Sequence, residues 1–265
     1  MIKIGKNLKI EDKSIYDPFI LYTKTKKVAI VGSAKNIQSY VKRSIKKILK
    51  IGSFFDDYRI VIHENDSRDN TVSLLKQQAK LNDKITIITE KGIKGNRTQM
   101  LAHSRNTLLK TVNSMEFTPD YYIVMDLDDK SILSPHSVLT CFDHKFIKQD
   151  WVMCGGNNSG AYYDVWALRC SGWLTTDYTR LRNKSGIWKT ITQDSKPIKV
   201  TSCFNGIGVY KYDLIRDCKY NGDVTCEHVS FHKSILAKNR KHTMYINPKM
   251  LVAKVSKGSF IKSVI

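Results

Sequence analysis

The sequence predicts a single α/β domain with a mostly parallel central sheet flanked by helices. In the first half of the chain, short apolar runs rich in β-branched residues alternate with segments of helical spacing, which is the pattern of βαβ units. The 265 residues, 42% of them hydrophobic, provide one substantial core and require no second domain. We therefore expect an N-terminal extension over residues 1–26 and one domain over residues 27–265.

Strands and helices are expected to alternate regularly up to the middle of the chain. The expected strands are 27–32, 58–63, 84–89 and 121–125, and the expected helices are about 37–50, 71–81 and 98–112. Ligands of such sheets bind beyond the carboxyl ends of the strands. The polar residues after the second and fourth strands therefore mark the expected site.

The second half of the chain is less regular. Its expected elements are strands at 151–156, 161–168, 200–212 and 243–246, a helix at 227–238, and a long loop at 171–197. The sequence shows no internal repeat and no low-complexity linker.

The charge balance limits the classes of partner. The chain has 44 Lys and Arg residues against 24 Asp and Glu, a formal net charge of +20, which attracts polyanions, anionic membranes and phosphorylated substrates alike. In the segment 37–50 the basic residues lie between apolar ones at helical spacing, which favours a solvated helix face. Peripheral contact with an anionic membrane stays open for this face, and we expect no specific nucleic-acid partner.

The cysteines and the N-terminus predict a cytoplasmic protein. No C-x-x-C pair occurs, so a structural zinc site has no support. The N-terminus has lysines but no apolar signal region, and no segment reaches the roughly eighteen uncharged apolar residues of a membrane span. In a cytosolic chain we expect buried, unbridged cysteines. The six are Cys141, Cys154, Cys170, Cys203, Cys218 and Cys226.

The strongest chemical signal is an acidic cluster, Asp126-Leu127-Asp128-Asp129, which follows the expected strand 121–125. Adjacent carboxylates repel one another, and a bound cation relieves the repulsion. In extended chain, Asp126 and Asp128 lie on one side and Leu127 on the other. Hard carboxylate oxygens, completed by diphosphate oxygens, suit Mn²⁺ or Mg²⁺. The alternative is an Asp-rich turn without an ion.

A second polar segment, Glu64-Asn65-Asp66-Ser67-Arg68-Asp69-Asn70-Thr71, follows the expected second strand. Together with the acidic cluster it resembles the GT-A glycosyltransferases, whose second strand ends in a D-G-S-x-D-x-T-type loop and whose fourth strand ends in D-x-D. The resemblance implies a GT-A (Rossmann-like) domain. It also implies that Glu64 contacts the nucleotide base or ribose and that Asp128 holds the metal on the diphosphate. Asp66 stands where the family has glycine.

A closer resemblance lies further along the chain. The segment 102–109, with Arg105 and Asn106, is similar to the A-x-x-R-N-x-L-L helix of fungal α-mannosyltransferases. The segments 162–169, 200–206 and 226–232 are similar to stretches of the capsule-associated α-1,3-mannosyltransferases. The resemblance covers about residues 27–250 and implies a donor-binding part at about 27–130 and an acceptor-side part at about 131–265. A histidine that many relatives carry after their last strand has no evident match here.

Several further residues are candidates for donor contact. Arg97 and Arg105 flank the helix expected at 98–112, and an arginine fork matches phosphate oxygens, although an exposed helix arginine explains Arg97 equally well. Gly206, after Asn205, permits close backbone approach to a sugar. Gly32, at the end of the first strand, and Leu127, between the two aspartates, complete the candidates for donor contact.

Three acceptor-side residues are candidates for the chemistry. Glu227, at the start of the helix expected at 227–238, is the catalytic base if the reaction inverts, and orients the acceptor if it retains. His228 is a candidate metal ligand. A packed, hydrogen-bonded histidine that supports the site without binding metal explains it equally well. Asp164 lies between aromatic residues, the company that carbohydrate sites favour.

These observations predict a metal-dependent glycosyltransferase that moves a sugar from a UDP- or GDP-linked donor to a hydroxyl of a glycan or similar acceptor. One alternative is a nucleotidyltransferase, which also uses paired aspartates and Mg²⁺, but its Gly-rich loop is missing after the first strand at 32–36. The other alternative is a basic nucleic-acid-binding protein, which the acidic cluster at 126–129 opposes.

Overall fold

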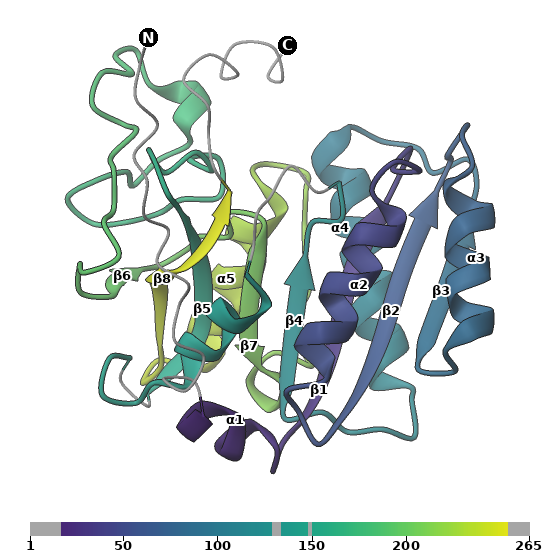
Figure 1. Cartoon of the computed structure of the whole chain (residues 1–265). Coiled ribbons are helices and arrows are strands. Elements are labelled where there is room, and N and C mark those ends of the chain that lie inside the picture. The colour runs from purple at the N-terminus through teal and green to yellow at the C-terminus, as the bar shows by residue number, and fades with distance from the viewer. Residues whose placement is uncertain (1–16, 129–133, 148–149, 254–265) are drawn as a thin grey trace, which may run out of the picture.

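A mixed sheet forms the centre of the molecule (Figure 1). The computed structural model describes residues 17–128, 134–147 and 150–253. Within these residues the sheet has eight strands in the order β3-β2-β1-β4-β7-β5-β8-β6. The strands are β1 (Lys27–Ala34), β2 (Asp57–Asn65), β3 (Ile85–Glu90), β4 (Tyr121–Met125), β5 (Trp151–Asn158), β6 (Ile198–Val200), β7 (Ile207–Lys211) and β8 (Thr243–Ala253).

The first four strands are parallel to one another, as predicted. Strand β1 pairs in parallel with β2 and β4, and β2 pairs in parallel with β3. Strand β7 runs antiparallel between β4 and β5, while β5 and β8 are parallel and β6 is antiparallel to β8. The carboxyl ends of β1, β2 and β4 therefore meet at one edge of the sheet, uppermost in Figure 1.

Helices cover both faces of the sheet (Figure 1). They are α1 (Asp17–Thr23), α2 (Val41–Gly52), α3 (Thr71–Leu81), α4 (Arg97–Asn113) and α5 (Glu227–Lys238). Alternation along β1 separates two cores: Val28 and Ile30 pack with α2, whereas Ala29 and Val31 pack with α4 and α5. Burial of these two apolar faces is the main favourable contribution to the fold.

Two strands expected in the second half are not formed as expected. The segment 161–168 forms no strand: Ala161 makes a single bridge to Thr190, and a turn follows. The segment 200–212, expected as one strand, is divided between β6 and β7 because Asn205 (φ 59°) and Gly206 (φ 84°) adopt left-handed backbone conformations. Such conformations interrupt a strand. The helix expected at 227–238 forms with those bounds as α5.

One expectation about the cysteines is wrong. Cys141, in the 3₁₀ segment Pro135–Phe142, is bonded to Cys154 in β5. The sequence offers no spacing signal for this pair, because β5 brings Cys154 back against the preceding segment. The other four cysteines are buried and free, as expected.

The last part of the predicted N-terminal extension packs on the domain. It forms α1, where Tyr22 and Tyr121 share a hydrogen bond between their hydroxyl oxygens (2.7 Å) and the Thr23 hydroxyl donates to the Phe54 carbonyl (2.7 Å). Residues 1–16 lie outside the described part of the chain.

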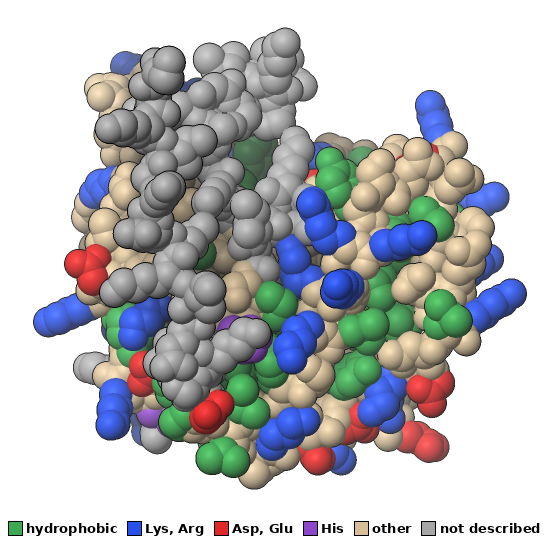
Figure 2. Space-filling model, viewed as in Figure 1, with side chains coloured by type: hydrophobic (Ala, Val, Ile, Leu, Met, Phe, Trp, Pro, Cys, Tyr) green, Lys and Arg blue, Asp and Glu red, His purple; other side chains and the backbone are tan. Residues whose placement is uncertain are grey.

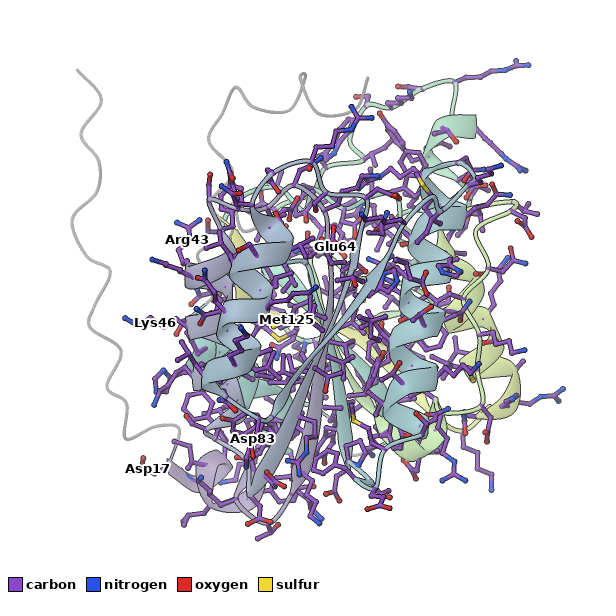
Figure 3. All side chains as sticks on the ribbon, turned by 90° about the vertical axis from the view of Figure 1, so that its right-hand side faces the viewer. Asp17, Arg43, Lys46, Glu64, Asp83 and Met125 are labelled. Atoms are coloured by element: carbon purple, nitrogen blue, oxygen red, sulfur yellow. A yellow bond between two sulfur atoms is a disulfide. The ribbon has the colours of Figure 1, made fainter. Side chains whose placement is uncertain are left out.

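The basic residues are spread over the surface. Figure 2 shows Lys and Arg side chains on the face that α2 covers, separated by apolar and uncharged groups. In Figure 3, Arg43 and Lys46 point outward from α2, away from the sheet. Within the described residues, none of the helices combines the length and the apolar character needed to cross a membrane.

Candidate active site

Asp126 lies at the carboxyl end of β4, between two other elements. Its backbone N–H donates to the Gly206 carbonyl (2.9 Å), next to the start of β7. Its carboxylate faces Arg105 of α4, with 3.6 Å between Nη2 and Oδ1. A Cβ atom added to Gly206 would lie 3.8 Å from Oδ2 of Asp126 and 3.5 Å from the Tyr163 hydroxyl. The left-handed turn at Asn205 and Gly206 thus brings backbone close to this carboxylate.

The acidic cluster alternates as the sequence predicts. Asp126 and Asp128 are exposed and Leu127 is buried. The Leu127 side chain packs so closely on Gly32 that a Cβ atom there would come within 2.6 Å of it. Gly32 therefore makes room for the Leu127 side chain, and the Leu127 carbonyl accepts a hydrogen bond from the Ser44 hydroxyl (2.9 Å). Asp129 lies outside the described residues.

The electrostatic environment of Asp126 raises the pKa of its carboxyl group. Desolvation is the largest cause that raises its pKa, Arg105 opposes the rise, and the nearby Asp128 and Asp164 carboxylates add to it; the net result is a pKa of about 6. Since 45% of the Asp126 side-chain surface is accessible, water on the open side offsets part of this desolvation.

A buried ion pair connects α4 with α5. The Arg105 guanidinium donates to the Glu227 carboxylate, and these residues are 5% and 3% exposed. The guanidinium also lies over the rings of Phe204 (5.2 Å) and Tyr220 (6.0 Å). Arg105 therefore contacts both acidic candidates, Glu227 and Asp126, from the interior of the domain.

His228 is packed beside this pair. Its ring stacks on Phe204 with 3.8 Å between centroids, and neither ring nitrogen has a hydrogen-bond partner among the described residues. Burial, together with the Arg105 charge, holds the pKa of His228 well below its usual range, so the ring is neutral. Within the described part of the chain, His228 does not join Asp126 and Asp128 in a group whose donor atoms all lie within 4.8 Å of one another.

Asp164 supports the loop before β7. One carboxylate oxygen accepts from the Ala167 N–H (3.2 Å) and the other from the Asn205 N–H (2.8 Å). Burial raises the pKa of Asp164, and the two backbone donors lower it. Both carboxylate oxygens of Asp164 thus accept hydrogen bonds from backbone N–H groups. These bonds hold the chain in a turn, so the segment 161–168 does not continue as a strand.

The segment after β2 is a closely bonded loop. Glu64 is 2% exposed, and its Oε1 accepts from the Ser67 N–H (2.9 Å); Figure 3 shows it near the upper end of the sheet. Asp66 has φ 53°, and its carboxylate accepts from the Gly92 N–H (2.6 Å). Left-handed backbone is where glycine is favoured and where Asp is tolerated. This explains why Asp66 stands at a position where the GT-A loop has glycine.

Arg97 is the first residue of α4 and is exposed. Its charge is among those that lower the pKa of Asp126, which places it on the side of the site that faces the acidic cluster. A cavity of about 180 Å³ opens nearby. Its lining includes Asn96, Trp166, Asp177, Tyr178, Val224 and Cys226.

The aromatic surroundings of Arg105 could not be predicted from the sequence. Phe204 and Tyr220 lie beside the guanidinium, and Tyr220 stacks on Phe231 with 3.8 Å between ring centroids. No local pattern marks these residues, because Phe204, before β7, and Tyr220, before α5, become neighbours of Arg105 only in the folded chain.

The sheet order, the paired aspartates after β4 and the polar loop after β2 are those of the GT-A fold. The sequence model of the family described as Cryptococcal mannosyltransferase 1 matches residues 27–244. The chain belongs to this family. No curated protein matches the chain.

Solved structures share the fold at low sequence identity. One is the mannosyltransferase PcManGT from Pyrobaculum calidifontis in complex with GDP-Man and Mn²⁺, with 13% identity, a TM-score of 0.58, and coverage of 90% of this chain and 59% of that chain. Another is S. aureus TarS 1–349 in complex with UDP-GlcNAc, with 12% identity, a TM-score of 0.54, and coverage of 90% and 61%. The chain thus spans less than two thirds of either protein.

Proposed function

We propose that the chain transfers a hexose from a UDP- or GDP-linked donor to a hydroxyl of a glycan or similar acceptor, with Mn²⁺ or Mg²⁺ as cofactor. The observation that carries the proposal is the position of Asp126 and Asp128 at the carboxyl end of β4, beside Arg105 and Gly206. The complexes of PcManGT with GDP-Man and Mn²⁺ and of TarS with UDP-GlcNAc support a nucleotide-sugar donor.

The donor set fits a hard divalent cation. Asp126 and Asp128 are exposed carboxylates, and oxygen ligands of this kind suit Mn²⁺ and Mg²⁺. The raised pKa of Asp126 reflects in part unrelieved repulsion between carboxylates, which positive charge would remove. When bound, such a cation acts as a Lewis acid that stabilises negative charge on the diphosphate.

The protein's own groups then have separate tasks. Arg105 orients the Asp126 carboxylate from the interior of the domain. Its guanidinium is itself held in place by Glu227 and by the rings of Phe204 and Tyr220. Arg97, exposed at the start of α4, is free to donate to the leaving diphosphate. Glu64 uses one oxygen within its loop, and we assign its second oxygen to the ribose or base of the nucleotide.

Gly206 and Asn205 approach the sugar with their backbone, and the exposed rings of Tyr163 (37%) and Trp166 (42%) provide apolar faces for carbohydrate. Asp164 holds this loop in place through its two backbone hydrogen bonds. Glu227 is buried against Arg105, so we assign it to positioning of Asp126 and of the acceptor side of the site. It is not our candidate for the base.

Titration calorimetry tests the donor assignment. Binding of UDP, GDP and dTDP is measured with Mn²⁺ and again with excess EDTA, followed by transfer assays with the sugar form of the nucleotide that binds. We expect one nucleotide to bind in a metal-dependent manner. Equal affinity for all three nucleotides, or nucleotide binding that is unchanged by EDTA, would contradict the proposal.

Two further assignments concern the surroundings of the protein. The exposed basic residues of α2, among them Lys42 and Lys46, fit a peripheral contact with an anionic membrane, which vesicle co-sedimentation with and without anionic lipid would test. The Cys141–Cys154 disulfide favours an oxidising compartment over the cytoplasm that the sequence predicts. Thiol titration of the denatured protein from its native host distinguishes four free cysteines from six.

A further inference from the structure

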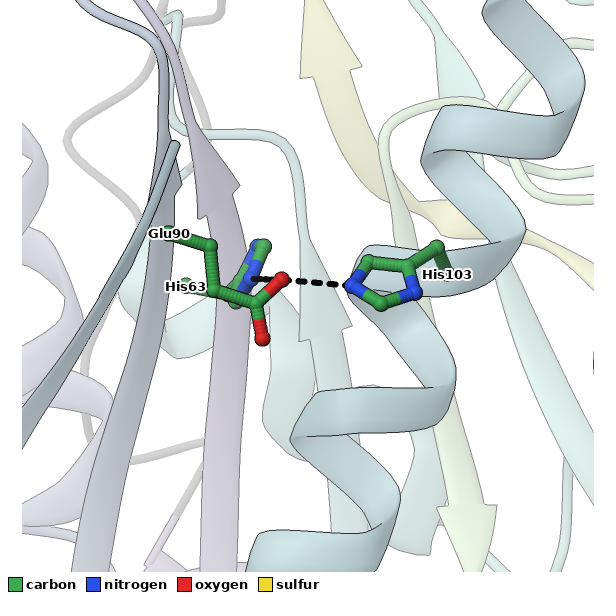
Figure 4. A group of neighbouring side chains, drawn as sticks. All are labelled: His63, Glu90 and His103. Carbon is green, nitrogen blue, oxygen red and sulfur yellow. Dashed lines mark hydrogen bonds and ion pairs between the residues drawn. The ribbon is translucent and has the colours of Figure 1, made fainter. Parts of the chain in front are cut away.

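Three side chains of metal-binding types meet on the opposite side of β2 from Glu64. They are His63 of β2, Glu90 at the end of β3, and His103 of α4 (Figure 4). The Glu90 Oε2 atom lies 3.3 Å from His63 Nε2 and 2.5 Å from His103 Nε2. One donor atom from each residue lies within 4.8 Å of the others. The group is separate from the acidic cluster at the end of β4.

His63 is a fully buried imidazole whose polar contacts are incomplete. Its side chain is 0% exposed, and its Nδ1 atom has no hydrogen-bond partner among the described residues. Its Nε2 atom makes a 3.3 Å ion-pair contact with Glu90 Oε2. Buried polar atoms without partners are costly and rare. Because Nε2 is directed at the Glu90 carboxylate, an ion bound between these two atoms would be held by both of them.

The distances are close to those of a tetrahedral site. Ligand atoms that each lie about 2.0–2.1 Å from a tetrahedral Zn²⁺ are separated by about 3.3–3.4 Å. The separation of His63 Nε2 and Glu90 Oε2 is 3.3 Å. His103 is closer to Glu90 than that, but its side chain is 48% exposed and has room to move outward.

We propose that His63, Glu90 and His103 bind a transition-metal ion of the Zn²⁺ class, separately from the cation of the acidic cluster. Two imidazole nitrogens and one carboxylate oxygen are a donor set that zinc prefers, whereas Mg²⁺ and Mn²⁺ prefer oxygen ligands. Glu90 and His103 are 34% and 48% exposed, so a fourth ligand, water, enters from solvent.

An ion at this position ties together two segments that lead into the active site. His63 immediately precedes Glu64, and His103 lies two residues before Arg105. The ion therefore joins the end of β2, the end of β3 and the first half of α4. Binding to the folded state alone raises the stability of the fold.

The test uses the full chain without a polyhistidine tag, stripped with chelator and then dialysed. Titration calorimetry with ZnCl₂ is expected to show one tight site, and Co²⁺ is expected to give the visible absorption of tetrahedral coordination. His103→Ala removes a half-exposed ligand with little risk to folding. Because even outer-shell changes weaken metal sites about 10–100-fold, we expect at least about a 100-fold loss of zinc affinity.

Three controls make the result specific. His144→Ala removes an exposed histidine outside the group and should bind zinc as the wild type does. Asp128→Asn should also retain zinc, and loss of zinc in that variant would show that the ion occupies the acidic cluster. Zinc should raise the melting temperature of the wild type but not of His103→Ala.

Besides loss of zinc in Asp128→Asn, two results would overturn the inference. One is the absence of zinc binding by the wild type, which would leave the group as a Glu90-bridged pair of histidines. The other is equal zinc affinity in His103→Ala and His144→Ala.

Discussion

Arg105→Met should strongly destabilise the fold, because it leaves Glu227 as a buried carboxylate without its counter-ion. Both residues are at most 5% exposed, and removal of one partner of such a pair costs about 3–5 kcal/mol. Loss of the cation–π contacts with Phe204 and Tyr220 adds about 0.5–2 kcal/mol.

Glu227→Gln should cost less, about 1–3 kcal/mol, because Arg105 keeps Asp126 at 3.6 Å as a second partner. The double variant should be more stable than the sum of the two single losses predicts, since neither charge is then left alone. Denaturant unfolding of the wild type, the two single variants and the double variant measures this coupling. A loss below about 1 kcal/mol for Arg105→Met, the value of a surface pair, would refute the reasoning.

Three other predictions concern the site and the core. Asp128→Asn should abolish transfer and metal-dependent nucleotide binding while the melting temperature stays unchanged, and activity that survives in EDTA would contradict it. Glu64→Ala should weaken nucleotide binding by about 1.5–3 kcal/mol, as read by calorimetry; unchanged affinity would remove Glu64 from the donor site. Burial, aided by Arg105, lowers the pKa of His232 to about 3, so the unfolded chain takes up the proton first as the pH falls below about 6.5. His232 alone should then lower the stability by about 2 kcal/mol between pH 7 and pH 5, in addition to the contribution of His228, whose pKa is also lowered. His232→Gln should reduce the slope without abolishing it, and an unchanged slope would mean that other groups cause it.

The parallel half of the fold could be predicted because its signals are local. Alternating apolar runs and helical spacing indicated β1 to β4 and α2 to α4 with bounds close to those observed. The same strand alternation predicted that Asp126 and Asp128 lie on one side of the chain and Leu127 on the other, and in the structure the two aspartates are exposed while Leu127 is buried. The carboxyl ends of neighbouring parallel strands share an edge, so the polar residues after β2 and β4 lie at the same edge of the sheet, as predicted.

Elements that depend on left-handed backbone or on distant partners were not predicted. The division between β6 and β7 requires positive φ at Asn205 and Gly206, which a run of apolar residues does not reveal. The turn after residue 161 depends on Asp164, whose carboxylate is held by the Asn205 N–H 41 residues away.

The sequence by itself determined the class of fold and the residue types that follow β2 and β4 at the edge of the sheet where we propose the site. The tertiary structure alone decided which of those residues meet. Arg105 and Glu227 are 122 positions apart and pair only because α4 and α5 lie on the same face of the sheet. His63, Glu90 and His103 come from two strands and a helix. The reason is physical: periodicity reports how each segment orients its own side chains, whereas contacts between segments depend on how their buried faces pack together.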